Sequence, residues 1–403
     1  MSLFLFRYVR LIGNTYAYLR SRPVPLPPNP TYSKKDVTVV MPTADPTEQF
    51  AASLRSIATQ GPGKILVVTV GAEKSKKARR IAEIVPGNIE VVDHGVMSKR
   101  EQLCAGIRLV KTPLVFEADD SIFWPDGFIE HMIAPFEDHS VGCVGCTKQV
   151  RRLNLGWTAA DVCNFIGANY LSRHNFQILA TNYIDGGVFV VSGRCAAFRT
   201  NILADPSFMF RYLNEWFLGV GPLNVDEDNF ITRWLVTNNW NIAIQSGPHA
   251  TMETVIGDTG WNILFQKMFR WARTTFRSNA KSLVLERSCW RRHPWTVYAE
   301  FISSYFNAAL FYDSAMLLSL WKATLNPKAM FVLALWVFAS KMVKAIPHFR
   351  RHPKDLVYLP VYVLFGYVHS FIKLWAAFTV FDISWSSRPE TTQTVPKSEK
   401  ATN

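Results

Sequence analysis

The stretch Pro113-Leu114-Val115-Phe116-Glu117-Ala118-Asp119-Asp120 decides the fold class of this chain of 403 residues. Its first half is a short apolar run of the kind found in buried strands, and it ends in acidic residues. Side chains alternate in direction along a strand, so Glu117 and Asp119 are expected to point to one side. Two oxygen donors placed there can hold Mg²⁺ or Mn²⁺, with substrate phosphates as further ligands. A solvated acidic turn is an equally good interpretation of these residues by themselves.

Apolar runs of strand length alternate with segments of helical spacing upstream of this stretch. Strands are expected at residues 37–41, 65–70 and 89–92, and helices at 49–60, 74–84 and 99–110. This alternation predicts an α/β fold with a mostly parallel sheet. Ligands of such sheets bind beyond the carboxyl ends of the strands, where Thr43, Gly71 and Asp119 fall.

The C-terminal third is far more apolar than the rest of the chain. Three apolar stretches run over residues 301–321, 329–346 and 356–381, each near the roughly 20 residues that a spanning helix needs. They are apolar on every face and flanked by basic residues such as Arg350 and Arg351. The sequence therefore predicts three transmembrane helices rather than buried helices of a soluble domain.

The formal net charge of +13 suits anionic lipids and phosphorylated ligands. We favour these over nucleic acid because the basic residues cluster beside apolar segments. Residues 1–20 are apolar but interrupted by Arg7 and Arg10, which predicts an interfacial or marginal membrane helix rather than a cleaved signal peptide.

Of the six cysteines, only Cys143 and Cys146 have metal-ligand spacing, and without a second pair we expect them to be buried in a strand.

Three further motifs carry candidate chemistry. The triplet Asp226-Glu227-Asp228 precedes an apolar helix and is either favourable charge at a helix N-terminus or a general base for a sugar hydroxyl. The turn at Ser192-Gly193 permits close approach of the backbone to a ligand, although an ordinary strand turn explains it as well. The stretch Gln266-Lys267-Met268-Phe269-Arg270-Trp271 offers a guanidinium for pyrophosphate and an indole face.

In this order, the motifs resemble those of the membrane-integrated processive glycosyltransferases of family 2, the hyaluronan, chitin and cellulose synthases, and most closely the fungal type 2 glycosyltransferases. The resemblance covers about residues 36–390. Its elements are Pro42-Thr43 at a strand end, Glu117-Ala118-Asp119 as the metal motif, Ser192-Gly193 and Phe198-Arg199 on the acceptor side, the base at Asp228, Arg270-Trp271, and the late Phe378-Thr379-Val380 and Ser384-Trp385-Ser386-Ser387-Arg388 near the donor.

The resemblance implies a role for each matching residue. Asp228 and Glu227 are the catalytic candidates. The donor-binding candidates are Thr43, Lys99, Arg100, Glu117, Asp119, Gln266, Arg270 and Trp271, the acceptor-binding candidates are Ser192, Gly193 and Trp271, and the metal ligands are Asp119 and Glu117 for Mg²⁺ or Mn²⁺. The partners implied are a UDP-sugar donor, a glycan acceptor and membrane lipid, and no nucleic acid.

The sequence departs from the family pattern in four ways. One concerns topology: three spanning segments would put the Trp385 element on the side opposite the catalytic domain, so either one segment is interfacial or re-entrant or that match is spurious. The other three concern single motifs. Glu117 replaces the first Asp of the metal motif, and Lys267 occupies the strict Gln position with Gln266 beside it. The second strand ends in Thr69-Val70-Gly71 where the family usually has Asp, with Asp45 or Asp93 as candidate substitutes.

The predicted architecture is an α/β GT-A domain, a Rossmann-like mixed sheet, with C-terminal transmembrane helices. We expect an N-terminal helix and Pro-rich spacer over residues 1–30, a cytosolic GT-A domain over 31–294, transmembrane helices over 295–381 and a polar tail over 382–403. The expected function is that of a processive inverting polysaccharide synthase of cell-wall type, in a multi-pass protein of the plasma membrane. The alternatives are a non-processive transferase with a lipid acceptor and an inactive membrane scaffold. The sugar, the linkage and the oligomeric state are left open.

Overall fold

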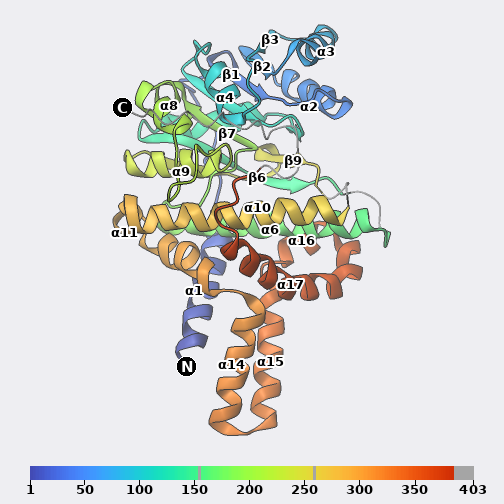
Figure 1. Ribbon diagram of the computed structural model, residues 1–403, viewed down its shortest axis with the longest axis vertical. Helices are drawn as coiled ribbons and strands as arrows, with labels where there is room; N and C mark the ends of the chain where they lie inside the picture. Colours follow the sequence, from blue (N-terminus) through green and yellow to red (C-terminus); the bar gives the residue numbers. More distant parts are fainter. Residues whose placement is uncertain (153–155, 257–259, 385–403) are drawn as a thin grey trace, which may run out of the picture.

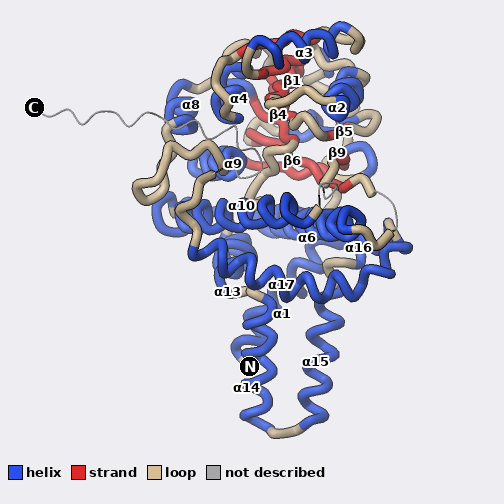
Figure 2. Tube along the Cα trace, turned by 45° about the vertical axis from the view of Figure 1, so that its right-hand side comes forward, coloured by secondary structure: helices blue, strands red, loops and turns tan. Residues whose placement is uncertain are grey.

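A mixed sheet forms the upper body of the molecule in the computed structural model, which describes residues 1–152, 156–256 and 260–384 (Figures 1 and 2). Within this part of the chain the sheet has nine strands in the order β3-β2-β1-β4-β7-β6-β9-β5, and β8 also pairs with β6. The strands are β1 (Val37–Pro42), β2 (Lys64–Thr69), β3 (Ile89–Asp93), β4 (Leu114–Ala118), β5 (Ile122–Phe123), β6 (Val141–Val150), β7 (Cys195–Arg199), β8 (Asn241–Gln245) and β9 (Thr251–Thr254).

The direction of the strands changes next to β4. Strands β1 to β4 are parallel, with Val39 opposite both Ile65 and Phe116, whereas β7 runs antiparallel to β4 with Ala197 opposite Phe116. The predicted parallel strands and the helices between them are confirmed, but β4 continues to Ala118. Glu117 therefore lies inside the sheet and Asp119 just beyond its edge, at the carboxyl end where ligands of such sheets bind.

Helices cover both faces of the sheet and extend below it. The α-helices are α1 (Ser2–Arg20), α2 (Glu48–Ala58), α3 (Ala72–Glu83), α4 (Lys99–Ile107), α5 (Phe128–Ile133), α6 (Ala159–Asp185), α7 (Thr200–Leu203), α8 (Pro206–Leu213), α9 (Glu227–Thr237), α10 (Trp261–Ala280), α11 (Ser288–Arg292), α12 (Pro294–Thr296), α13 (Ser303–Phe306), α14 (Ala309–Thr324), α15 (Pro327–Met342), α16 (Ile346–Arg351) and α17 (Leu359–Phe378). Four 3₁₀ segments, η1 (Lys34–Asp36), η2 (Ala134–Glu137), η3 (Pro248–Ala250) and η6 (Pro353–Tyr358), and two π-helical segments, η4 (Lys281–Glu286) and η5 (Val297–Ile302), complete the described chain.

The core consists of two apolar layers on the two faces of the sheet and a third beneath it. Val39, Phe50 and Phe116 belong to one layer, and Val40 and Leu103 belong to the other. The third layer joins α6, α10 and α17, which lie below the sheet (Figure 1). All six cysteines are buried and free, and Cys143 and Cys146 lie in β6, which confirms the buried-strand interpretation.

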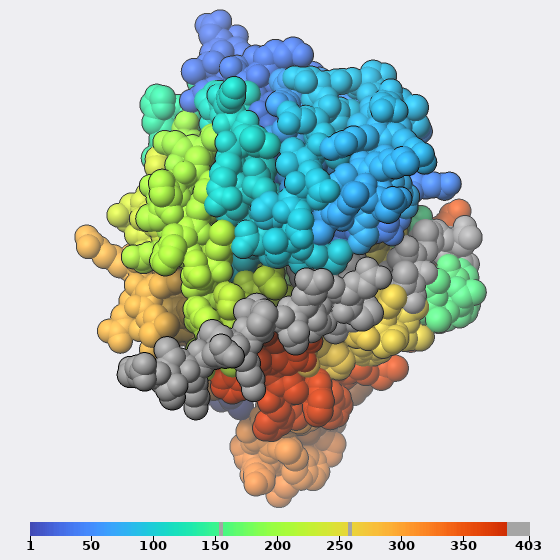
Figure 3. All heavy atoms as spheres, turned by 45° about the horizontal axis from the view of Figure 1, so that its top comes forward, coloured from blue at the N-terminus to red at the C-terminus, as the bar shows by residue number. Residues whose placement is uncertain are grey.

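The C-terminal apolar stretches form a projecting hairpin and one longer helix. Helices α14 and α15 run away from the body and back, and this hairpin also projects in the view turned by 45° (Figures 1 and 3). Each has 16 residues, about 24 Å of helix, which is shorter than the ~30 Å core of a bilayer. By length and composition, one helix in the described residues, Pro353–Phe378, could cross a membrane, where the sequence predicts three.

The difference arises from breaks that the apolar composition does not reveal. Ala308 has an extended backbone that separates the stretch at 301–306 from α14, and Leu325 turns the chain in the left-handed conformation between α14 and α15. Asp313 then forms ion pairs with Arg7 and Lys341, which tie the hairpin to α1. Because the hairpin returns the chain to its starting side, the residues after α17 reach α10, where Arg273 and Arg277 bind Thr379, Val380 and Asp382.

Candidate active site

A cavity of about 820 Å³ lies at the carboxyl ends of β1 and β4. Pro42 and Ala44 line it from the end of β1, Asp119 from the end of β4, and Lys267 from α10. The remaining walls come from the turn before β7, the start of α9 and the segment that follows α17. Most of the predicted site residues, far apart in the sequence, therefore meet in one place.

Lys99, the first residue of α4, lies at the centre of the acidic groups. Its Nζ donates to Asp119 Oδ1 at 2.8 Å and to the carbonyl oxygen of Gly193 at 2.6 Å. It also lies 3.0 Å from Glu117 Oε1 and 3.2 Å from Glu227 Oε1. Burial opposes the charge of Lys99, but the surrounding carboxylates raise its pKa well above the usual value, so Lys99 carries the positive charge that holds this cluster together.

Glu117 and Asp119 have different environments although they share one side of the strand. The side chain of Glu117 is 2 % exposed, and burial raises its pKa to about 8. Its ion pair with Lys99 lacks hydrogen-bond geometry, and neither oxygen of Glu117 has a hydrogen-bond partner in the described residues. The side chain of Asp119 is 29 % exposed and lines the cavity. Asp119 is therefore the carboxylate that a ligand in the cavity can reach.

Asp228, which the sequence predicts as the general base, lies in the first turn of α9 and lines the cavity. Its Oδ2 accepts a hydrogen bond from the backbone nitrogen of Gly193 at 3.3 Å, and its Oδ1 accepts one from that of Asn229 at 2.8 Å. Burial and the neighbouring charge of Glu227 raise the pKa of Asp228 to about 6. A carboxylate with this pKa is ionised at neutral pH and is a better proton acceptor than an ordinary Asp.

Gly193 allows the turn before β7 to approach the acidic pair. A Cβ at this position would lie 3.1 Å from Glu227 Oε1, 3.2 Å from Asp228 Cβ and 3.5 Å from Lys99 Nζ. Ser192 and Gly193 both line the cavity, where the sequence places the acceptor. A Cβ at position 193 would therefore crowd the side chains of Glu227 and Asp228.

One face of α10 lines the cavity with Lys267, Arg270 and Trp271, which are three and four residues apart on the helix. The Trp271 ring stacks on Tyr170 with ring centroids 5.2 Å apart, which fixes its orientation. Gln266 lies outside the cavity, and its amide donates to Asn262 Oδ1 at 3.2 Å. Gln266, predicted to bind the donor, therefore does not line this cavity, whereas its neighbour Lys267 does, because one residue turns a helix by about 100°.

Arg100 does not reach the cavity, which corrects its assignment as a donor-binding residue. The side chain of Arg100 is 1 % exposed and donates to Glu215 Oε2 at 2.7 Å and to the carbonyl of Val225 at 2.7 Å. Glu215 also pairs with Arg233 and Lys281. Despite the opposing effect of burial, these three cations lower the pKa of Glu215 to about 2. Arg100 is thus a structural residue that supports the segment before α9.

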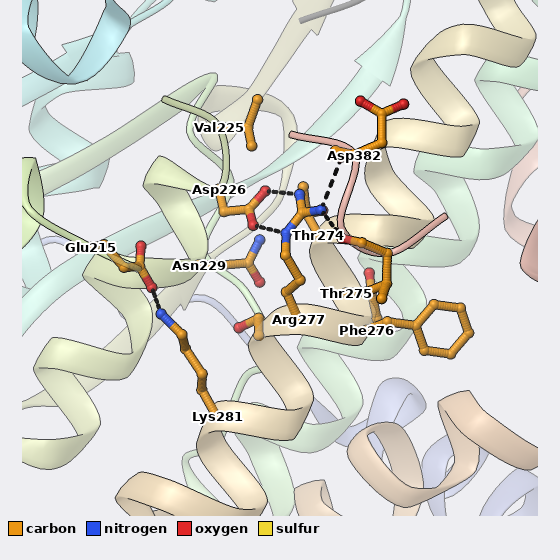
Figure 4. Close-up of polar contacts among 12 residues, drawn as sticks. Glu215, Val225, Asp226, Asn229, Thr274, Thr275, Phe276, Arg277, Lys281 and Asp382 are labelled. Atoms are coloured by element: carbon orange, nitrogen blue, oxygen red, sulfur yellow. Dashed lines mark hydrogen bonds and ion pairs between the residues drawn. The ribbon is translucent and has the colours of Figure 1, made fainter. Parts of the chain in front are cut away.

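A second buried ion pair fixes the chain that follows α17. Arg277 of α10 donates from Nε and Nη2 to the two oxygens of Asp226, at 2.7 and 2.9 Å. Its Nη1 donates to the carbonyl oxygens of Val380 at 2.7 Å and Asp382 at 3.2 Å (Figure 4). Asp226 is therefore bound to Arg277, whereas Glu227 and Asp228, the two predicted catalytic residues, both line the cavity. Phe381 to Ser384 line the cavity, and the Ser384–Arg388 match lies largely outside the described residues.

Thr43 lies beneath the cavity rather than in its wall. It is 2 % exposed, and its hydroxyl donates to Asp120 Oδ2 at 2.9 Å. Neither candidate substitute for the missing second-strand acid lines the cavity. Asp93 accepts from the backbone nitrogen of Gly71 at 2.9 Å, and Asp45 pairs with Lys77.

Three cationic or titratable residues of the cavity were missed by the sequence reasoning: Lys148, His174 and Arg194. Burial lowers the pKa of Lys148 to about 7. Arg194 lies over the ring of Trp271, with 5.6 Å from Cζ to the ring centroid. The pattern that could have revealed Lys148 is its position as a charged residue inside an apolar strand.

The acidic groups fit a metal ion only in part. In the described parts of the chain no group of three or more His, Cys, Asp or Glu side chains is arranged to hold a metal. Mg²⁺ in sites of this kind takes one or two carboxylates and completes its shell with water and substrate phosphates. Both Glu117 and Asp119 lie beside the ammonium of Lys99. Asp119 fits the partial role because it lines the cavity, whereas Glu117 is buried and does not line it.

Comparisons with known proteins agree with this geometry. Residues 34–274 match the family described as "Glycosyltransferase like family 2". A "Type 2 glycosyltransferase" of Pyricularia oryzae is 37% identical over 397 residues, which is 96% of this chain and 81% of the relative. The NDP-glycosyltransferase ltbB of Aspergillus luteorubrus is 28% identical over 70% of this chain and 71% of its own length. The mannosyltransferase PcManGT from Pyrobaculum calidifontis, solved with GDP-Man and Mn²⁺, shares the fold, with a TM-score of 0.56, 16% identity and coverage of 96% of this chain and 98% of its own.

Proposed function

The chain belongs to glycosyltransferase family 2, and from this membership and the cavity we propose that it is an inverting transferase in which Asp228 is the general base. The observation that carries the proposal is the position of Asp228 in the cavity wall, with a pKa raised to about 6. The donor is a nucleotide sugar, as the family implies. The acceptor is a hydroxyl group presented between Asp228 and Trp271.

The transfer follows from this arrangement. Asp228 takes the proton of the acceptor hydroxyl as its oxygen forms a bond to the anomeric carbon. The bond from that carbon to the phosphate oxygen breaks, and the electron pair leaves with the nucleoside diphosphate. Arg270 and Lys267 line the side from which the diphosphate would leave, and their charges stabilise it. Attack from the face opposite the leaving group inverts the anomeric configuration.

A divalent cation fits the proposal, and we assign Asp119 as its protein ligand. The metal would neutralise charge on the diphosphate of the donor. Lys99 pairs with Glu117 and Glu227 as well as with Asp119, so its ammonium balances part of the charge of this acidic cluster. Asp120, held by Thr43, is the adjacent carboxylate and fixes the end of β4.

The apolar surface of the lower helices supports work at a membrane. Large apolar side chains are exposed along the hairpin, among them Leu318, Phe331 and Leu335, and along α1, where Ile12 and Leu19 are exposed. Exposed apolar surface of this extent marks a membrane or protein contact. We propose that the hairpin enters the bilayer and that α17 lies at its surface or crosses it, with the catalytic sheet outside the membrane.

The structure supports single transfer to a membrane-anchored acceptor over polymer extrusion. Extrusion needs a pore enclosed by spanning helices, and one described helix is long and apolar enough to span. The resemblance to the polysaccharide synthases, in contrast, favours polymer synthesis. Residues Val380 and Asp382, held over the cavity by Arg277, occupy the place where that resemblance puts a gating element.

The test measures nucleoside diphosphate release by the purified chain with Mg²⁺ or Mn²⁺ across a panel of UDP- and GDP-sugars, followed by sizing of the product. Release with one donor and a product that carries one added sugar is expected. A long polymer would overturn single transfer and restore the synthase function. No release with any donor from a folded, nucleotide-binding protein in lipid extract would refute the transferase and favour the inactive scaffold.

A further inference from the structure

A second cavity of about 240 Å³ lies on the membrane side of the catalytic cavity. The two cavities share the lining residues Tyr170, His174, Phe189 and Thr275, so they lie side by side. The second cavity is enclosed by α1, α6, α10, η5, α15 and α17. We propose that it binds the phosphate of a membrane-anchored acceptor, which rests on the proposed function and defines its acceptor class.

The walls of the second cavity carry a large excess of positive charge. Its lining cations are Arg7, Arg10, Arg173, Lys341, Lys344 and Lys373. Two carboxylates oppose these six cations. Glu300 lines the cavity, and Asp313 pairs with Arg7 and Lys341 from behind. Four cationic groups therefore remain in excess, in a space walled by protein.

The unbalanced cations are held in place by neutral groups. Arg10 is 7 % exposed and donates to the carbonyl oxygen of Ala299 at 3.0 Å. Lys373 donates to the carbonyl oxygen of Ser304 at 3.0 Å. In the described chain, Arg173 and Lys344 form no ion pair with a carboxylate within 4.0 Å. Burying cations in this way is costly unless an anion completes the site.

The titration of Lys344 reflects this imbalance. Burial, followed by the charge of Arg10, lowers the pKa of Lys344 to about 7, and Glu300 offsets only part of the effect. A bound anion would reverse the shift, because it would favour the charged ammonium.

Phosphate matches the site better than a carboxylate does. Arg7, Arg10 and Arg173 bring three guanidinium groups, whose planar forks pair with phosphate oxygens. A phosphate monoester carries about −1.5 to −2 charges at pH 7, which suits an excess of several cations. A carboxylate carries one charge and would leave most of that excess unbalanced.

A lipid is the favoured source because the outer surface of the enclosing helices is apolar. On α17, Leu364 and Phe371 are exposed, and on α15 Leu335 and Phe338 are exposed. An acyl or prenyl chain can lie along these residues while its phosphate occupies the cavity. The adjoining catalytic cavity then receives the hydroxyl-bearing part of the same molecule.

Binding of decyl phosphate, decanol and inorganic phosphate to the full chain in detergent, measured by thermophoresis, tests the site. Wild type is expected to bind decyl phosphate at least about tenfold more tightly than either of the others, because only decyl phosphate offers both charge and chain. In the double variant Arg173→Gln/Lys344→Gln, the ratio of the affinity for decyl phosphate to that for decanol is expected to fall by about tenfold or more. The charge-preserving Arg173→Lys/Lys344→Arg should retain most of it.

The matched control is Lys76→Gln/Arg79→Gln, which removes the same two charges from the exposed face of α3, far from the hairpin (Figure 1). It should bind decyl phosphate like wild type. Nucleoside diphosphate binding, measured on every variant, shows that the catalytic domain is folded and separates this test from that of the transferase. Equal binding of decanol and decyl phosphate, or full binding by Arg173→Gln/Lys344→Gln, would overturn the site. If inorganic phosphate bound as tightly as decyl phosphate, the phosphate would not need to come from a lipid, and that part of the proposal would be overturned. If a uronate oligosaccharide bound more tightly than decyl phosphate, the ligand of this cavity would be an anionic glycan and the lipid phosphate would be overturned.

Discussion

Replacing Arg277 by Met should destabilise the protein strongly. The side chains of Arg277 and Asp226 are each 2 % exposed, and the guanidinium supplies both hydrogen bonds to the carboxylate. Removing one partner of a buried ion pair costs about 3–5 kcal/mol, because the other charge is left without compensation. For a domain of about 250 residues this corresponds to a fall of roughly 6–20 °C in the unfolding midpoint.

The same substitution removes the donors to Val380 and Asp382, so the segment that lines the catalytic cavity loses these two hydrogen bonds to α10 and keeps those of Arg273 to Thr379 and Asp382. The assay is thermal unfolding in detergent, with proteolysis after residue 378 as a second readout. Asp226→Leu/Arg277→Met removes both charges and should recover most of the lost stability, because no buried charge is then unpaired. Arg79→Met, an exposed arginine on α3, is the matched control and should change the free energy of unfolding by less than about 0.5 kcal/mol. A loss below about 1 kcal/mol for Arg277→Met, or a double variant as unstable as the single one, would refute the reasoning.

The remaining predictions concern the catalytic cavity. The pKa of Asp228 is raised to about 6, and a general base must be ionised to accept a proton. The value of kcat/KM should therefore be constant above about pH 7 and fall about tenfold per pH unit well below pH 6. A flat profile of kcat/KM from pH 5 to 8 would contradict this. Lys267→Gln should weaken nucleoside diphosphate binding about tenfold in titration calorimetry, because Lys267 lines the cavity. Gln266→Ala, one position away on α10, should change that affinity less than about twofold. Equal effects of the two variants would contradict the conclusion that Lys267, and not Gln266, faces the cavity. Gly193→Ala should lower kcat by about 10²-fold, because its Cβ would lie 3.1 Å from Glu227 Oε1 and displace Glu227 and Asp228. A wild-type kcat in this variant would contradict the prediction, because it would show that the turn shifts to make room for the methyl group.

The sequence predicts the parallel part of the sheet well because each strand is a local apolar run that ends in a turn residue. The meeting of Asp119 and Asp228 is expected from the resemblance to the family and not from the strand pattern, because Asp228 lies in the first turn of a helix that follows α8 rather than a strand. The burial of Arg100 could not be predicted in this way. Its partner Glu215 is 115 residues away and belongs to no recognisable motif.

The C-terminal region shows where composition alone is insufficient. Apolar content does not distinguish a spanning helix from a hairpin, because the outcome depends on single residues such as Ala308 and Leu325 where the helices break. Likewise, the order Gln266-Lys267 matches two registers of the family motif, and only the rotation of α10 decides which side chain enters the cavity. The ends of these helices and the side chains that enter the cavity therefore depend on tertiary contacts that local patterns do not encode.

The most direct test of the central claim is single-turnover sugar transfer by Asp228→Asn, with donor affinity measured on the same protein. Asn has nearly the same size and can keep the hydrogen bond from Gly193, but it cannot accept a proton. We expect the transfer rate to fall by about 10²–10⁴-fold while the dissociation constant of the nucleotide stays within about twofold of wild type. Transfer at the wild-type rate would contradict the assignment of Asp228 as the base.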